Sequence, residues 1–96
     1  MTYKKFLETL KKTNRNWILS ASGAMIVRLD TLRCPITTVC SIVCGDIFDN
    51  SQYLYAARRL KLRRNLAENI VIAADNRMHT RHQARIRRDL LRATGL

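Results

Sequence analysis

The sequence predicts a mainly α-helical domain of the α+β kind, with four to five short helices and one small β-hairpin near residues 17–29. Apolar residues recur at spacings of three and four along most of the chain, which is typical of amphipathic helices. The chain has one Pro and three Gly among its 96 residues, too few for a loop-rich or all-β protein. This length is enough for a single hydrophobic core, so residues 1–96 are predicted to form one domain.

The first part of the chain contains a predicted helix followed by the hairpin. Thr2 can cap the helix and residues 14–16 should end it. Its apolar face is formed by Tyr3, Phe6, Leu7 and Leu10. Residues 17–19 and 24–29 then flank a Ser-Ala-Ser-Gly turn, in which Gly23 supplies the freedom in φ that a tight turn needs.

Pro35 and Gly45 mark the two ends of the next element, since Pro suits a first helical turn and Gly a helix stop. The residues between them are apolar on nearly every side, which indicates a central buried helix. A β-branched run of this length is also compatible with a strand, but the flanking Pro and Gly favour the helix.

Three more helices are predicted in the second half of the chain. Asp49 with Gln52 resembles a capping box, and Thr80 with Gln83 matches one fully. A helix that starts at Arg63 or Arg64 should end at residues 75–76, and Gly95 should end the last helix. The predicted buried residues of these helices are Tyr53, Ala56, Ala57, Leu60, Leu66, Ala67, Ile70, Ala73, Ala74, Ile86, Leu90 and Ala93.

A strong positive charge is the main functional signal. Eighteen Lys and Arg against seven Asp and Glu give a net charge of +11, and thirteen of the cations are Arg. Arginine suits phosphate oxygens and base edges, so the composition predicts affinity for polyanions.

Four of these arginines fall on one face of the last predicted helix, at spacings of four, three and four. We call this set the arginine row: Arg81, Arg85, Arg88 and Arg92. Like charges at such spacings repel one another, so the row indicates an anionic partner that compensates them. A solvated basic face without a partner is the structural alternative.

Residues 53–73 resemble a helix-turn-helix unit, with small or apolar residues at its expected positions: Ala57, Leu60, Leu62, Ala67 and Ile70. Lys61 stands where the turn usually has Gly. The resemblance implies that the second helix exposes Arg63, Arg64, Asn65, Glu68 and Asn69 to a major groove. Arg would then contact guanine and Asn would pair with adenine. Two ordinary packed helices are the structural alternative.

Catalytic and metal-binding patterns are not evident. The acidic residues form no close pair, and no Gly-rich phosphate loop or nucleophile elbow is present, so we expect no catalytic residues and a non-enzyme. Three cysteines, an odd number, argue against a disulfide framework. Cys34, Cys40 and Cys44 would need His79 or His82 to complete a zinc site, at an uncommon spacing. We therefore expect reduced, buried thiols, no metal and no cofactor.

The compartment is predicted to be the cytoplasm of a bacterial host cell. Residues 2–15 lack the apolar run of a secretory signal, and the longest apolar-rich stretch, 35–44, is about half a membrane span. A membrane partner is therefore not expected.

Several short motifs resemble small phage and prophage proteins of no settled function. The motifs are Trp17, Leu19, Gly23, Ile26, Arg28, the Cys-Pro-Ile-Thr of 34–37, the Leu-Lys-Leu of 60–62 and the Ala-Ala-Asp-Asn of 73–76. The resemblance implies a mobile-element setting.

The leading hypothesis for the function is a basic protein that binds DNA or RNA through its C-terminal half. The alternative is an anti-CRISPR-like inhibitor that binds a host nucleoprotein complex or an acidic protein surface. The oligomeric state stays open.

Overall fold

A computed structural model describes residues 1–13, 18–19, 25–27 and 31–94 of the chain. Within these residues a short 3-10 helix, η1 (Asn50–Gln52), and five α-helices form. The α-helices are α1 (Tyr3–Thr13), α2 (Pro35–Cys44), α3 (Tyr53–Arg59), α4 (Arg64–Ala74) and α5 (Arg81–Ala93). The prediction of a mainly α protein is confirmed.

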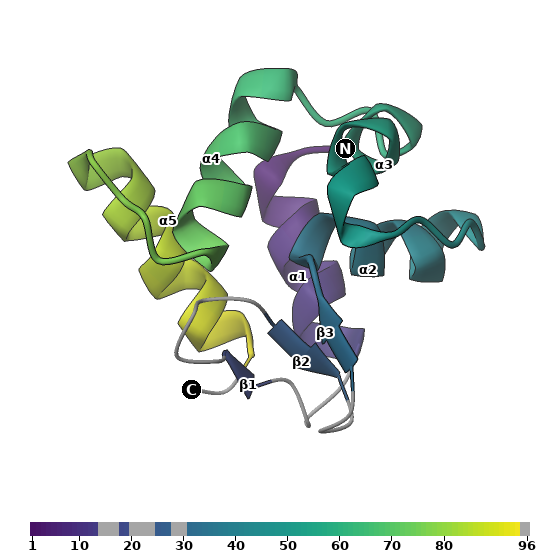
Figure 1. Cartoon of the computed structure of the whole chain (residues 1–96), viewed down its shortest axis with the longest axis horizontal. Coiled ribbons are helices and arrows are strands. Elements are labelled where there is room, and N and C mark those ends of the chain that lie inside the picture. The colour runs from purple at the N-terminus through teal and green to yellow at the C-terminus, as the bar shows by residue number, and fades with distance from the viewer. Residues whose placement is uncertain (14–17, 20–24, 28–30, 95–96) are drawn as a thin grey trace.

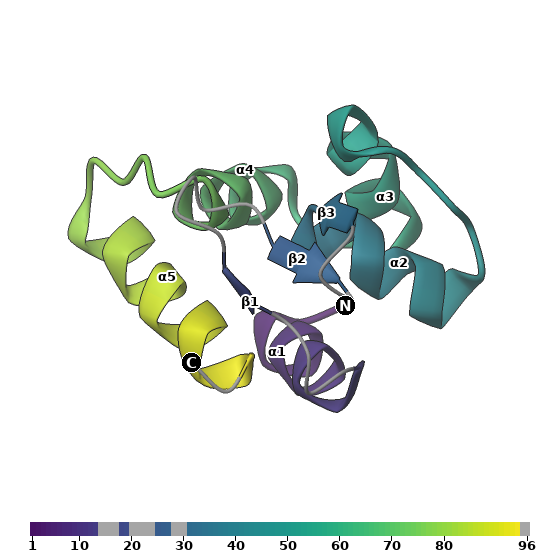
Figure 2. The same cartoon turned by 60° about the horizontal axis from the view of Figure 1, so that its bottom comes forward.

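The helices are arranged around α1, which lies between α5 on one side and α2 and α3 on the other in both views (Figures 1 and 2). α4 packs against α5 and α3, and α2 packs against α1, α3 and α4. All five helices contribute to one core, which is built from Phe6, Leu10, Ile36, Val39, Cys40, Ala56, Ala57, Leu60, Leu62, Ala67, Ile70, Ala73, Ala74, Ile86 and Leu90.

Three short antiparallel strands precede α2: β1 (Ile18–Leu19), β2 (Met25–Val27) and β3 (Thr31–Arg33). Ile18 lies opposite Ile26, and Met25 lies opposite both Leu19 and Arg33. The predicted hairpin needs Trp17, the turn at 20–23 and residues 28–29, which lie outside the described residues, so the hairpin stays a prediction. β3 was not expected from the sequence.

The predicted caps of the first two helices are present. The Thr2 hydroxyl oxygen accepts a hydrogen bond from the Lys5 N–H at 3.1 Å, at the start of α1. α2 begins at Pro35 and ends at Cys44, and its C-cap is Gly45, whose φ is +74°. The Gly45 N–H donates to the Ser41 carbonyl oxygen at 3.1 Å. The segment is a helix, so the strand alternative is wrong.

The expectation that α2 is buried throughout is also wrong. Its residues from Pro35 to Cys40 are buried, but the side chains of Ile42 and Val43 are 52% and 51% exposed. The reason is one of position: the last turns of α2 project past the neighbouring helices at the edge of the molecule (Figure 1).

α1 is joined to α5 by a polar contact as well as by the core. The Tyr3 hydroxyl donates to the Asp89 carboxylate at 2.8 Å. Burial of the ring, together with this bond and the charge of Asp89, raises the pKa of Tyr3. The phenol therefore stays protonated and available as a donor at physiological pH.

The turn between α3 and α4 contains a strained residue. Lys61 adopts a left-handed φ of 57°. Its N–H donates to the Arg58 carbonyl oxygen at 3.1 Å, and the Leu62 N–H donates to that of Ala57 at 2.9 Å. These two bonds form the Schellman motif, which ends helices and favours Gly at the position that Lys61 occupies.

Lys61→Gly should therefore stabilise the protein. A left-handed backbone costs a residue with a Cβ atom about 1 kcal/mol, part of which is offset by the greater freedom of Gly in the unfolded chain. We expect the free energy of unfolding to rise by about 0.5 kcal/mol in a denaturant titration. Lys61→Ala is the control because it removes the same side chain but keeps Cβ. Equal stability of the two variants would contradict the strain at this turn.

The caps of the second half are also largely as predicted. The capping box of Asp49 and Gln52 forms and starts η1, directly before α3. At α5, the Thr80 hydroxyl oxygen accepts from the Gln83 N–H at 3.1 Å. The Gln83 side chain, however, accepts from the His79 N–H and not from that of Thr80, so this box is only half formed. Gly95, the predicted stop of α5, lies outside the described residues.

Candidate nucleic-acid interface

The connection between α4 and α5 places the start of α5 beside the middle of α4. Asn76 has a left-handed φ of 59°, which turns the chain back after α4. The Gln83 side chain then donates to the Asn69 side-chain oxygen at 3.0 Å. Further along α5, the Arg87 guanidinium reaches the Ala73 carbonyl oxygen at 2.9 Å. The two helices therefore run in the same general direction, as Figure 1 shows.

A groove of about 540 Å³ lies where the two helices begin, and we call it the α4–α5 groove. Its lining residues are Arg63, Arg64, Asn65, Leu66, Asn69 and His82. Four of them are residues that the sequence predicted to contact nucleic acid. The sequence named His82 only as a residue that could complete a zinc site, and the structure brings it to this groove because the 75–80 connection folds back.

The start of α4 adds to the positive character of the groove. Its first turn contains no acidic residue, and Arg63 at the N-cap forms no side-chain cap. Cations here oppose the positive end of the helix dipole, so an anion bound nearby would relieve an unfavourable interaction. One acidic side chain intervenes: Glu68 accepts from the Arg64 side chain at 3.1 Å, in a largely exposed pair. Such a pair contributes about 0–1 kcal/mol, so it opposes ligand binding only weakly.

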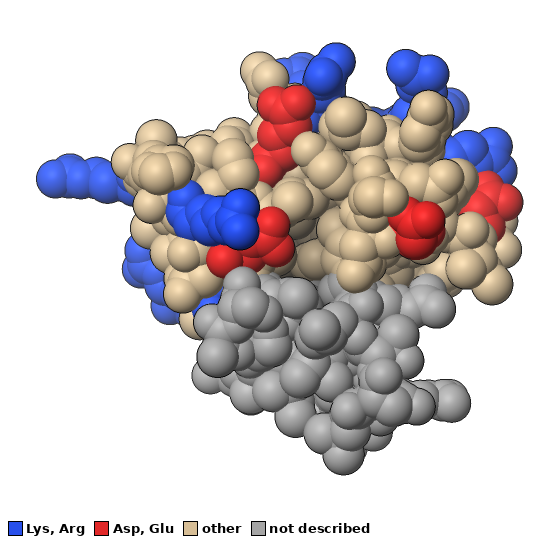
Figure 3. Space-filling view, viewed as in Figure 1, with Lys and Arg blue, Asp and Glu red and all other residues tan. Residues whose placement is uncertain are grey.

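The arginine row runs along the exposed side of α5. All four side chains are exposed, and none forms an ion pair or a side-chain hydrogen bond with another residue that the structure describes. The opposite side of α5 is buried through Gln83, Ile86 and Leu90. In Figure 3, Lys and Arg side chains project along the upper and left margins of the molecule, over the beginning of α4 and over α5.

Arg87 also lies on α5 but is not part of the arginine row. The sequence did not single it out. It is half-buried, and its guanidinium donates to the carbonyl oxygens of Ala73 and Ala74 at 2.9 Å and 3.4 Å. These are carbonyls of the last turn of α4, where a cation is also favoured by the helix dipole. Arg87 therefore ties α5 to α4.

Arg87 and Arg88 should respond to the same substitution in opposite ways. Arg87→Met leaves two carbonyl oxygens without their charged donor, and we expect a loss of about 1–3 kcal/mol in the free energy of unfolding. Arg88→Met, on an exposed position of the row, should change stability by less than about 0.5 kcal/mol. Chemical denaturation of both variants measures this difference. Equal stability losses would show that the contact to α4 contributes nothing.

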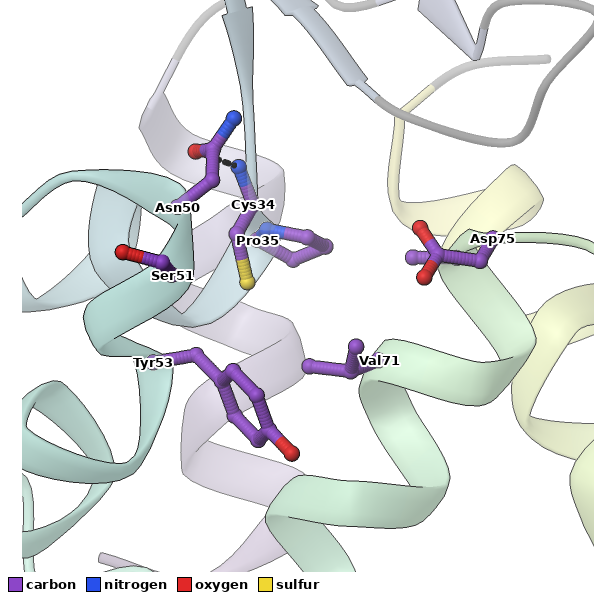
Figure 4. Close-up of a pocket in the computed structure, with 8 residues that line it drawn as sticks. Cys34, Pro35, Asn50, Ser51, Tyr53, Val71 and Asp75 are labelled. Carbon is purple, nitrogen blue, oxygen red and sulfur yellow. Dashed lines mark hydrogen bonds between the residues drawn. The ribbon is translucent and has the colours of Figure 1, made fainter.

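A second cavity, of about 220 Å³, lies between the start of α2, η1 and the end of α4. Cys34, Tyr53, Val71 and Asp75 come from three separate segments to line it (Figure 4). The Cys34 N–H donates to the Asn50 side-chain oxygen at 2.7 Å, which joins η1 to α2. The cavity lies away from the residues of the α4–α5 groove and shares none of them.

The three cysteines are free thiols. Burial raises the pKa of Cys34, and burial beside Cys44 raises the pKa of Cys40 to about 11. Both thiols therefore stay protonated near neutral pH, and protonated thiols are poor nucleophiles. Cys40 is buried as expected, whereas Cys34 and Cys44 are only half-buried.

The described residues contain neither a metal-binding cluster nor a membrane-spanning helix. They contain no group of three or more His, Cys, Asp or Glu side chains placed to hold a metal ion. None of their helices combines the length and the apolar composition needed to cross a membrane.

Comparison with known proteins adds no relative from which a function could be transferred: no family model, no curated protein and no solved structure matches the chain.

Proposed function

We propose that this chain is a non-enzymatic protein that binds nucleic acid through the α4–α5 groove and the arginine row, with α3 and α4 acting as a helix-turn-helix unit. The observation that carries the proposal is the groove, where Arg63 and Arg64 at the start of α4 meet His82 at the start of α5. Arg81 precedes His82 directly, so the row begins one residue along α5 from the groove lining. Two basic segments that are separated in sequence therefore come together where α4 and α5 begin.

The row and the groove suit different parts of a nucleic acid. The row presents four exposed guanidinium groups along one helix face, none of them paired with a described residue, and this pattern suits contacts to successive backbone phosphates. The groove adds the amides of Asn65 and Asn69, which are side chains that contact base edges. We assign phosphate contacts to the row and base contacts to the groove.

Salt dependence tests the proposal directly. Binding that displaces counterions from about six phosphates should give a slope of about −5 when the logarithm of the association constant is plotted against that of salt concentration. We expect this slope for a DNA duplex, measured by fluorescence anisotropy. A flat response, or no binding at low salt, would contradict nucleic-acid binding.

A protein partner is the second candidate, and one observation favours it. Large apolar side chains are exposed on α2, on the loop that follows it and on α3. They are Ile42, Val43, Ile47 and Tyr55, with exposed fractions of 52%, 51%, 79% and 61%. An inhibitor of a host nucleoprotein, of the anti-CRISPR kind, would use such exposed apolar side chains together with the basic residues.

A pull-down from host cells, with and without nuclease treatment, separates the two candidates. A partner that remains after nuclease treatment, and that is lost in Val43→Ser or Tyr55→Ser, would support the protein-directed function. A nucleic acid that co-purifies and is lost in variants of the row would support the first. The origin of the chain from a phage or other mobile element stays a prediction.

A further inference from the structure

The side chain of Gln83 is held in one orientation by its surroundings. It is 9% exposed, and its amide lies between the His79 backbone and the Asn69 side chain. The His79 N–H donates to one of its amide atoms at 2.8 Å. A backbone N–H can only donate, so this atom is the oxygen of the Gln83 amide. The Gln83 nitrogen is therefore the atom that faces Asn69.

This orientation determines what Asn69 offers to the groove. The Gln83 nitrogen donates to the Asn69 side-chain oxygen at 3.0 Å. The oxygen of Asn69 is thus engaged, and its NH₂ group keeps two hydrogen-bond donors. Asn69 lines the α4–α5 groove beside Arg64, whose guanidinium is also a donor.

The sequence led us to expect that an Asn of α4 would pair with adenine. That pairing needs the amide oxygen to accept from adenine N6 while the amide nitrogen donates to N7. The bond from Gln83 occupies one of the two lone pairs of the Asn69 oxygen and holds this oxygen on the Gln83 side, so the pairing with adenine is disfavoured while the bond holds. Guanine presents two acceptors, N7 and O6, on its major-groove edge.

We propose that the α4–α5 groove binds the guanine edge of a DNA duplex, with Asn69 as a contact residue and Gln83 as the residue that positions it. The inference rests on the proposed nucleic-acid function and adds a base preference to it. Arg63 and Arg64 lie in the same groove and are the residue type that most often contacts guanine. Phosphate oxygens are acceptors too, and the experiment must distinguish them from the base.

Selection from a duplex DNA library with a randomised central segment provides the test. We expect wild-type protein to enrich guanine at one position or more, with discrimination of roughly tenfold against adenine. Asn69→Ala should lose the preference at one such position and keep the others. A loss of affinity that is equal for all sequences would mean that Asn69 contacts phosphate, and would overturn the proposal.

Variants of Gln83 test the positioning step through base preference, which a purely structural role would not change. In Gln83→Glu, the carboxylate accepts from both His79 N–H and the Asn69 NH₂ group, so the Asn69 oxygen turns toward the groove. The preference should then move from guanine to a base with a donor, such as cytosine. Gln83→Met removes both bonds, and the preference should relax. An unchanged guanine preference in both variants would overturn the positioning role.

Ala84→Glu is the matched control for the added negative charge. Ala84 is the exposed neighbour of Gln83 on α5 and forms no hydrogen bond to Asn69. This variant should lower the affinity for all duplexes without changing the preferred base, and a change in its preference would overturn the role of the Asn69 bond. If wild-type protein binds no duplex, the proposed function fails together with this inference. If it binds without any preferred base, only this inference fails.

Discussion

Replacing the four residues of the arginine row by glutamine should lower the affinity for duplex DNA by about 1,000-fold at low salt, with little change in stability. Each exposed guanidinium that contacts a phosphate releases counterions, so four lost contacts should make the salt slope less negative by about 3.6. The fold should persist because all four side chains are exposed and no described residue pairs with them. Anisotropy titrations across a salt series measure both effects.

Four lysines on α1 provide a control of equal charge: Lys4, Lys5, Lys11 and Lys12. They are exposed as well, and their replacement by glutamine removes the same four positive charges. Because α1 contributes nothing to the α4–α5 groove, we expect a slope close to that of the wild type. Equal losses in the two quadruple variants would mean that net charge alone determines binding, and that the row is an ordinary solvated face.

Local signals were enough to predict most helices of this fold. Pro35 and Gly45 mark the two ends of α2. Pro35 suits the first turn of a helix, and Gly45 takes the left-handed φ that ends one. Asp49 and Thr80 act as caps through bonds within three residues along the chain. Such bonds depend only on neighbouring residues, so their pattern in the sequence is informative.

Burial was harder to predict because it depends on where a helix lies among the others. Val43 continues the apolar face of α2 one turn beyond Val39, yet it is half-exposed because the helix extends past its neighbours. The pattern of apolar residues shows which face of a helix is apolar, but it does not show how far along the helix its neighbours cover that face. The exposed end of α2 is therefore visible only in the three-dimensional structure.

The candidate site was predictable in part for the same reason. Spacing alone places the arginine row on one face of α5, and its exposure agrees with that placement. Spacing cannot show that Arg87 caps α4, or that Gln83 engages Asn69, because each contact joins residues fourteen positions apart. A sequence pattern identifies residue types, whereas tertiary contacts decide which of their donors and acceptors remain free.

Phe6→Ala should cause the largest loss of stability among the substitutions considered. Phe6 is fully buried on α1, the helix that packs against both α2 and α5. Removal of a buried Phe side chain costs about 3–5 kcal/mol, from lost burial and the cavity that remains. For a domain of this size, that loss should lower the melting temperature by roughly 15 °C or more. Calorimetry measures the change.

Lys5→Ala is the control for Phe6→Ala, since it changes an exposed neighbour on the same helix and should stay within about 0.5 kcal/mol of the wild type. A similarly small effect of Phe6→Ala would contradict the packing of α1 in the core.

The Phe6→Ala variant should still bind DNA when folded, because Phe6 does not line the groove. A duplex at about 100 times its dissociation constant should then restore about 2.7 kcal/mol of stability, since it binds only the folded state. The same duplex should not stabilise the glutamine variant of the row, which folds but has lost its phosphate contacts.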